Sequence, residues 1–304
     1  MDKEQLRRRA TYASIGVAVT LIAIKLGAYF MTDSVAMLSS LLDSTVDLLA
    51  SLTTGYGVAT ALHPPDHDHR YGHGKAEPLA ALVQAAFIFG SSVLLGYEAL
   101  NRFYHPRDIQ HEVVGYFTML LAIFMTMGLI AYQRYVIRHT GSMAIGADRL
   151  HYTSDLAVNA AVIVAFGVTQ LTDATWIDPV FAIIIAGGMC YGAFGIAKEA
   201  LNVLMDKELS DDEREKIKVI AMAQMHVRGM HDLRTRTDGE RIFIEFHLEL
   251  DPEMTLRMAS QVNEAVIKAI RHEYPNADVQ THQDPEGLVE TRLDQKIAEN
   301  AIAK

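Results

Sequence analysis

The sequence has very little cysteine: Cys190 is the only one among 304 residues. A single thiol excludes an internal disulfide and any metal site built from several cysteines. Basic residues are also in the minority, with 27 Lys and Arg against 37 Asp and Glu, and seven of the ten excess negative charges lie in residues 206–304. This balance argues against nucleic acid as a partner, because nucleic acid would require a basic face.

Motifs that would indicate an enzyme are absent as well. The chain contains no HExxH, no phosphate-binding P-loop and no GxSxG. The sequence therefore lacks the catalytic motifs of a zinc protease, a P-loop nucleotide hydrolase and an α/β-hydrolase. We expect a protein that is not an enzyme.

Hydrophobic residues are abundant and make up 50% of the chain. They are gathered in six apolar segments, each long enough for a helix that spans about 30 Å of hydrocarbon. No small-residue cleavage pattern follows the first segment, so we interpret it as a retained membrane helix, with Lys25 snorkelling towards one surface. The fold class predicted is a polytopic α-helical membrane protein with a six-helix bundle. The segments are residues 15–31, 34–62, 78–97, 113–132, 156–172 and 179–197, of which the fifth can be extended backwards through Asp155 and His151.

Basic residues are unevenly distributed among the connections between these segments. One side of the membrane would carry only Arg102 and Arg107. Because cytoplasmic loops carry an excess of Lys and Arg, the opposite side is predicted to be cytoplasmic, with both termini on it. The basic residues of that side are Lys3, Arg7, Arg8, Arg9, Arg70, Lys75, Arg134, Arg138, Lys198 and Lys207.

After residue 206 the pattern changes to that of a small soluble domain. Helical spacing covers 211–224 and 256–273, with Ser210 as a candidate N-cap, and strand-like alternation covers 232–237, 241–250 and 277–282. The order αββαβ predicts a sheet backed by two helices. We divide the chain into a transmembrane domain (1–205), a cytoplasmic α+β domain (206–287) and a polar, loosely held helical tail (288–304).

Two of the apolar segments carry pairs of ionisable groups, Asp43 with Asp47 and His151 with Asp155. The i,i+4 spacing places each pair on one helix face. Buried carboxylates must take up protons or a cation, and the Asp43 helix has no Lys or Arg of its own. If the two faces meet, the four side chains suit tetrahedral Zn²⁺, and Fe²⁺, Mn²⁺ or Co²⁺ as well. The alternative is a purely structural polar network.

Two further groups of candidate ligands lie outside the apolar segments. The tract HPPDHDHRYGHGK over 63–75 is rich in His and Asp, which indicates either a metal-binding loop or a solvated linker. In the soluble domain the motif HQDP over 282–285 places His282 and Asp284 two residues apart at a strand end. His231 and His247 are further candidates there, or else ordinary polar surface residues.

Taken in order, DxxxD at 43–47, DHDHRYGHGKAE, HxxxD at 151–155, HDLRTR at 231–236 and HQDP make the chain resemble the cation diffusion facilitator family over nearly its whole length. The resemblance implies a homodimeric metal-ion/proton antiporter of the bacterial inner membrane with a cytoplasmic metallochaperone-like domain. Ser260 occupies a position where the family often has a further histidine. For transport, the metal ligands implied are Asp43, Asp47, His151 and Asp155. In the loop they are Asp66, His69 and His73, with His67 and Asp68 ranked below them. In the soluble domain the resemblance implies a binuclear site of His231, His247, His282 and Asp284.

We therefore expect a proton-coupled carrier that exports Zn²⁺, with Fe²⁺, Cd²⁺ and Mn²⁺ as further candidate substrates. Metal binding releases protons because the ligands must be deprotonated. Protonation of His151 and a carboxylate on the outer side then expels the ion, since imidazole titrates close to neutral pH. The alternatives are a membrane-anchored metal sensor, which would need no acids in the membrane, and a passive divalent channel without proton coupling.

Overall fold

The computed structural model describes the chain except for residues 1, 33–34, 105–112, 173–175, 290–291 and 303–304. Arg107, which we predicted to lie in a loop, is therefore outside the described residues. The chain divides into two compact units, Met1–Leu201 and Asn202–Lys304, and each is described by itself.

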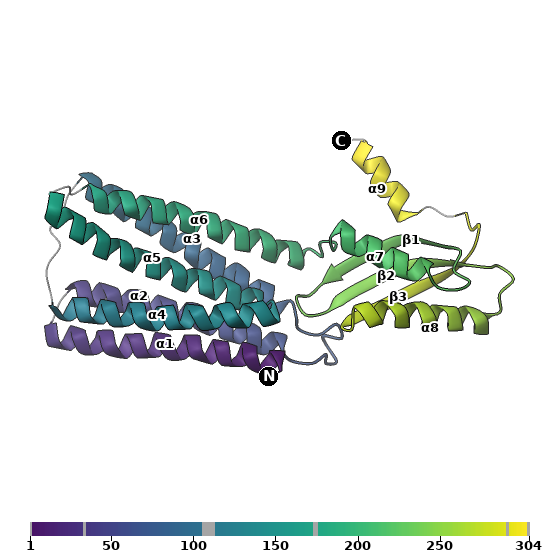
Figure 1. The fold of residues 1–304 in the computed structure, drawn as a ribbon, viewed down its shortest axis with the longest axis horizontal. Helices are drawn as coiled ribbons and strands as arrows, with labels where there is room; N and C mark the ends of the chain where they lie inside the picture. Colours follow the sequence, from purple (N-terminus) through teal and green to yellow (C-terminus); the bar gives the residue numbers. More distant parts are fainter. Residues whose placement is uncertain (1, 33–34, 105–112, 173–175, 290–291, 303–304) are drawn as a thin grey trace. The chain divides into compact units, whose positions relative to one another are not determined.

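The first unit is built from long helices (Figure 1). Except for α2, they extend beyond the apolar segments, as at α1, which begins at Lys3, twelve residues before the predicted segment. The polar flanks continue the helix because Gly and Pro are rare in them. The helices are α1 (Lys3–Thr32), α2 (Val35–Ala61), α3 (Ala76–Tyr104), α4 (Val113–Thr140), α5 (Met143–Thr172) and α6 (Ile177–Leu204).

Small residues allow these helices to pack closely. α2 contacts α1, α3 and α5, while α4 contacts α1 and α5. A Cβ at Gly57 of α2 would overlap the Ala80 methyl group of α3, and a Cβ at Gly192 of α6 would lie 2.8 Å from Leu150 of α5. Such close approach is typical of helix packing in membranes, where small residues bring backbones together.

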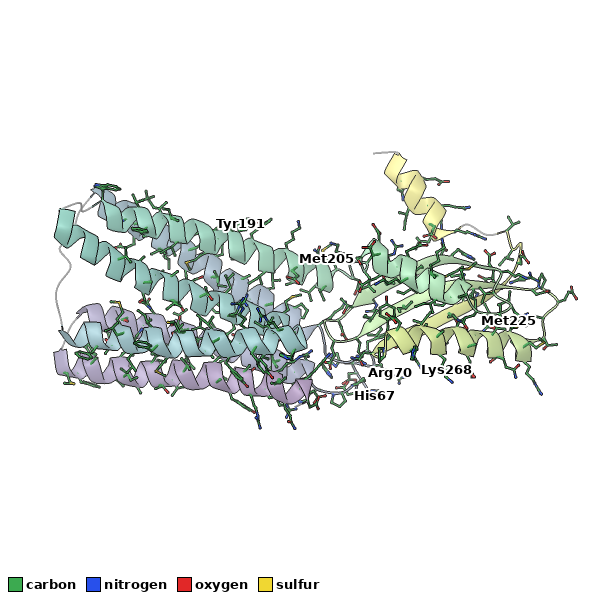
Figure 2. The ribbon with its side chains drawn as sticks, viewed as in Figure 1. His67, Arg70, Tyr191, Met205, Met225 and Lys268 are labelled. Carbon is green, nitrogen blue, oxygen red and sulfur yellow. The ribbon has the colours of Figure 1, made fainter. Side chains whose placement is uncertain are left out.

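Among the described residues, four helical stretches are long and apolar enough to cross a membrane. Only 17% to 33% of each stretch is buried inside the protein, and side chains such as Tyr191 on α6 project outward (Figure 2). An apolar surface this large is stable in contact with lipid and not with water. The remaining long helices, α2 and α5, carry the paired ionisable groups. The four stretches are Lys3–Met31, Ala76–Asn101, Phe117–Thr140 and Pro179–Leu204.

The second unit contains a three-stranded sheet in the order β1-β2-β3. β1 (Gly229–Thr237) is antiparallel to β2 (Ile242–Leu250), which is parallel to β3 (Ala277–Pro285). α8 (Leu256–Glu273) makes the crossover that parallel strands require, and α7 (Asp211–Met222) begins at the predicted N-cap Ser210. The predicted fold class, a helical membrane bundle followed by an αββαβ domain, is confirmed.

Alternation along β2 separates the core from a polar face. Ile244, Phe246 and Leu248 are buried against α7 and α8, in a cluster with Ile217 and Val266. The residues between them, which include His247, therefore point to the other face of the sheet, because successive strand side chains alternate. The sheet thus holds its candidate ligands on the face away from this core.

The C-terminal tail is anchored at its first turn, in contrast to the loosely held segment that we expected. The backbone N–H groups of Leu293 and Asp294, at the start of α9 (Leu293–Ile302), donate to the Asp232 carboxylate at 2.8 and 3.0 Å. The Asp294 carboxylate accepts the Asp232 N–H at 3.0 Å in return. Burial would raise the pKa of Asp232, but the N–H groups of Asp294 and Leu293 outweigh it and lower this pKa.

Candidate metal centres

Asp47 of α2 meets His151 and Asp155 of α5 inside the first unit. Nε2 of His151 lies 2.9 Å from Oδ1 of Asp47 and 3.7 Å from Oδ2 of Asp155. The ligand atoms of all three residues lie within 4.8 Å of one another. The His151 side chain is only 2% exposed. The helix faces of α2 and α5 that carry the i,i+4 pairs therefore meet, although they are distant in the sequence. We call Asp47, His151 and Asp155 the membrane cluster.

The protonation of the membrane cluster follows from its hydrogen bonds. When the Asp47 carboxylate is ionised it only accepts, so in that state Nε2 of His151 carries the proton and donates it to Asp47. Among the described residues, Nδ1 of His151 and Oδ2 of Asp155 are buried without a hydrogen-bond partner. An unpaired buried polar group costs about 1–3 kcal/mol, and a cation bound to Oδ2 of Asp155 would remove that cost for this oxygen. Imidazole nitrogen and carboxylate oxygen are a donor set that suits Zn²⁺.

Asp43 lies outside the membrane cluster. Its side chain is exposed, and its carboxylate is not among the ligand atoms that lie within 4.8 Å of one another. The charge of Asp43 nevertheless acts on Asp47 and on Asp155. The structure therefore brings together three of the four predicted transport ligands and leaves the fourth nearby.

Lys25 of α1 does not snorkel towards a membrane surface as the sequence suggested. Its ammonium donates to Oγ of Ser44 at 2.7 Å and to the backbone carbonyl of Ser40 at 3.1 Å, both on α2. Ser44 directly follows Asp43 in the sequence and is buried. A positive charge is thus held against the helix that carries the paired aspartates.

A buried polar network lies one helical turn before His151 on α5. Asp148 accepts hydrogen bonds from Ser14 and Gln133 at 2.7 Å and from Ser51 at 3.3 Å. The Ser51 hydroxyl also lies 2.9 Å from that of Tyr152. These side chains come from α1, α2, α4 and α5, so the network joins the four helices next to the membrane cluster.

The loop between α2 and α3 brings Asp66, His69 and His73 together. Oδ2 of Asp66 lies 3.3 Å from Nε2 of His73, and its Oδ1 lies 3.5 Å from Nδ1 of His69. Nδ1 of His73 donates to the His63 carbonyl at 3.4 Å, which leaves Nε2 to face Asp66. The N–H groups of His69 and Asp68 lower the pKa of Asp66 by donating to its carboxylate. The loop trio is therefore preorganised around an ionised carboxylate.

His67 and Asp68 stand apart from the loop trio. They pair with each other at 3.3 Å, and their side chains are 92% and 87% exposed. Figure 2 labels His67 on this loop together with Arg70, which is also exposed. His67 and Asp68 are therefore not part of the group formed by Asp66, His69 and His73, in agreement with their lower ranking as candidates.

The polar face of the soluble sheet aligns the predicted histidines in one row. His231, His247 and His282 are neighbours across β1, β2 and β3. Asp284 joins them, with its Oδ2 2.7 Å from Nδ1 of His247 and 3.8 Å from Nε2 of His231, and its Oδ1 3.3 Å from Nε2 of His282. His231, His247 and Asp284 have their ligand atoms within 4.8 Å of one another, whereas His282 is 70% exposed at the edge of this group.

Glu249 is a functional candidate that the sequence reasoning missed. Its Oε1 lies 3.0 Å from Nδ1 of His231, and it also accepts a 2.5 Å hydrogen bond from Arg292 of the tail. A carboxylate on one ring nitrogen orients the other towards a metal. The signal was available, because Glu249 lies two residues after His247 and therefore on the same face of the strand.

Comparison with known proteins places this architecture in a family. Residues 11–205 match the cation efflux transmembrane domain, and residues 209–286 match the cytoplasmic domain of cation efflux proteins. The chain belongs to the cation efflux family. The predicted resemblance to the cation diffusion facilitators is confirmed by these two matches.

Relatives in this family match almost end to end. The cation-efflux pump FieF of Shewanella oneidensis is 42% identical over 276 residues, which cover 91% of this chain and 93% of the relative. The pump of the same name from Klebsiella pneumoniae is 40% identical over 94% of this chain and 95% of its own length. A solved structure of CzrB in its Zn form is 27% identical, with a TM-score of 0.27, over 28% of this chain and 99% of its own.

Membership of the cation efflux family has two direct consequences. The protein is a multi-pass membrane protein, in agreement with its apolar helices. The family also indicates a transporter rather than an enzyme.

Proposed function

We propose that this cation efflux protein exports divalent metal ions from the cytoplasm in exchange for protons. Zn²⁺ is the principal substrate proposed, with Fe²⁺, Cd²⁺ and Mn²⁺ as further candidates. The observation that carries the proposal is the membrane cluster, in which Asp47, His151 and Asp155 converge between two helices. The two relatives named cation-efflux pumps support the direction of transport.

The hydrogen bond between His151 and Asp47 explains how a metal ion and a proton would compete. Nε2 of His151 and Oδ1 of Asp47 lie 2.9 Å apart and share a proton in this hydrogen bond. A metal ion needs the same nitrogen lone pair and the same carboxylate, so its binding must displace that proton. Reprotonation of His151 on the outer side would return the hydrogen bond and expel the ion. Asp43 would complete four ligands if its side chain turned towards the cluster.

The position of the cluster suits alternating access. α2 and α5 contact each other directly, and the cluster lies at that contact. A small rotation of one helix against the other would open the cluster to one side of the membrane or the other, as in carriers with a site between repeats. We also propose that residues 1–205 form the transport domain, that both termini are cytoplasmic and that the protein lies in the bacterial inner membrane.

The soluble domain would act in dimerisation and metal sensing. We assign residues 206–287 to this domain, and propose that metal on His231, His247, His282 and Asp284 stabilises a homodimer. Metal on Asp66, His69 and His73 of the loop would add to this effect. Ser260 is exposed on α8 and is a poor ligand, so the soluble site would hold its second ion weakly.

Flux measurements in proteoliposomes test the proposal. Zn²⁺ movement is followed with a fluorescent indicator while a pH gradient is imposed, for the wild type, Asp47→Ala and the control Glu199→Gln, an exposed acid on α6. We expect gradient-driven flux that Glu199→Gln retains. Asp47→Ala should lower this flux by more than the roughly 10- to 100-fold loss that is typical when a residue hydrogen-bonded to a metal ligand is substituted. Absence of flux would favour the sensor, and flux that ignores the gradient would favour the channel.

A further inference from the structure

Lys25 is a charged residue that the proposed transport chemistry does not use. It lies in a stretch of α1 that is apolar enough to cross a membrane. Charged side chains at such depth are costly and usually mark function. Its two hydrogen bonds, to Ser44 at 2.7 Å and to the Ser40 carbonyl at 3.1 Å, fix the ammonium on α2.

The surroundings of this ammonium are acidic. Its two hydrogen-bond acceptors lie on the same helix as Asp43 and Asp47, and Ser44 is 1% exposed. The charges of Asp47, Asp43 and Asp155 all act on Lys25. A lysine ammonium offers three donors and no acceptor, so it can balance these carboxylates without ever serving as a metal ligand itself.

Two positive charges would therefore compete for the same carboxylates. One arrives with the substrate, and the other is tethered to α1. Like charges repel, and this repulsion is stronger inside a protein than in water, so an ammonium held beside these carboxylates weakens the binding of a divalent ion. Weaker binding in turn favours release.

We propose that Lys25 is a tethered counter-cation that lowers the metal affinity of the membrane cluster and so speeds metal release. The proposal rests on the proposed transport function and deepens it. Lys25 is then a positioning residue of the transport reaction: it acts on the carboxylates and not on the metal directly. A purely structural lysine, serving only as a hydrogen-bond link between α1 and α2, is the competing explanation.

Charge and hydrogen bonding can be separated by substitution. Lys25→Gln keeps a donor but removes the charge, whereas Lys25→Arg keeps both. Lys198→Gln removes a lysine charge from an exposed position on α6 and serves as the matched control. Equilibrium Zn²⁺ titrations use the full-length chain carrying His73→Ala and His247→Ala in every variant, so that the loop trio and the soluble group do not contribute.

The tethered counter-cation predicts a combined change in binding and transport. For Lys25→Gln we expect the Zn²⁺ Kd and the transport KM to fall about tenfold, equivalent to about 1.4 kcal/mol, together with a fall in Vmax. Lys25→Arg and Lys198→Gln should keep Kd within about twofold of the wild type, a difference of about 0.4 kcal/mol. A Lys25→Gln protein with an unchanged Kd and a reduced Vmax would show that the role is structural, and would overturn the proposal.

A second variant guards against misfolding. Ser44→Ala leaves the ammonium in place but removes its closest tether, so we expect a smaller fall in Kd in the same direction. An unchanged Kd in a Ser44→Ala protein would also count against the proposal if Lys25→Gln cannot be purified. Failure of the transport function itself is distinguishable, because the wild type would then show no Zn²⁺ flux and Asp47→Ala would bind Zn²⁺ like the wild type.

Discussion

The imidazole of His151 and the carboxylate of Asp47 are hydrogen bonded at 2.9 Å although 104 residues separate them in the chain. The bond joins α5 to α2 at the point where both helices carry their i,i+4 pairs. Asp155 lies 3.7 Å from the same nitrogen and leaves a buried oxygen unpaired among the described residues. A proton therefore occupies the position where the three side chains would share a metal ion.

The Asp148 network should stabilise the helices around the membrane cluster. Asp148→Ala would leave Gln133, Ser14 and Ser51 without their shared acceptor, at about 1–3 kcal/mol for each buried group that finds no other partner. Asp148→Asn keeps a carbonyl oxygen and should cost less. We expect the Tm of the detergent-purified protein to fall in the order wild type, Asp148→Asn, Asp148→Ala. Equal Tm values for all three would show that the network contributes no stability.

The loop trio should bind metal with a pH dependence set by its histidines. The N–H groups of His69 and Asp68 lower the pKa of Asp66, so this carboxylate stays ionised as the pH falls from 8 towards 5. Imidazole takes up protons in that range and then no longer binds metal. Zn²⁺ affinity should therefore weaken on acidification, and Asp66→Asn should weaken it at every pH without changing the shape of the profile.

Calorimetric Zn²⁺ titrations at several pH values check the loop prediction. The protein carries Asp155→Ala and His247→Ala, so that the loop dominates binding. Asp68→Asn is the matched control, because Asp68 is 87% exposed and keeps the N–H that it donates to Asp66. If Asp68→Asn weakened binding as much as Asp66→Asn, the assignment of the trio would be wrong.

The tail should dissociate when Asp232 loses its carboxylate. Its lowered pKa means that the ionised form caps α9 at neutral pH, and that this contribution is lost only as the pH falls below the ordinary range of Asp. Capping interactions are worth about 0.5–2 kcal/mol. In Asp232→Gly we expect faster amide hydrogen exchange in α9 at pH 7, while between pH 7 and 5 the wild type should show no pH-dependent loss of protection beyond the intrinsic exchange rates.

Backbone strain offers a matched control for the tail experiment. Asp232 has a φ of 51°, and Asp206 of the same unit has a φ of 55°, so glycine suits both positions equally well. Asp206 pairs with Arg236 at 3.6 Å instead of with the tail. Asp206→Gly should therefore leave the exchange of α9 unchanged. Equal deprotection of α9 in both variants would point to general loosening of the domain.

The sequence predicted those features that depend on local periodicity. Hydropathy located the membrane helices, and alternation located the strands, so that α8 begins and ends at the predicted residues 256 and 273. Helical spacing put His151 and Asp155 on one face. The single lysine in an apolar segment was noticed, but the hydrogen bond of Lys25 to Ser44 depends on how α1 lies against α2, which spacing does not encode.

Other features required tertiary information for the same reason. The polar residues of the Asp148 network come from four helices, and no local pattern relates Ser14 to Gln133. Asp43 shares a helix face with Asp47, yet only Asp47 reaches His151, since the crossing of α2 and α5 selects one of the two. The anchoring of α9 depends on Asp232, whose positive φ follows from an irregularity in the pairing of β1 with β2.

The central claim is that Asp47, His151 and Asp155 bind the transported metal, and X-ray absorption spectroscopy tests it most directly. The sample is the full-length protein with His73→Ala and His247→Ala, loaded with Zn²⁺ and washed. We predict about one ion per chain, bound by one imidazole and by carboxylate oxygens at about 2.0–2.2 Å, and its loss when His151→Ala is added. A Zn²⁺ spectrum and stoichiometry that His151→Ala leaves unchanged would contradict the account.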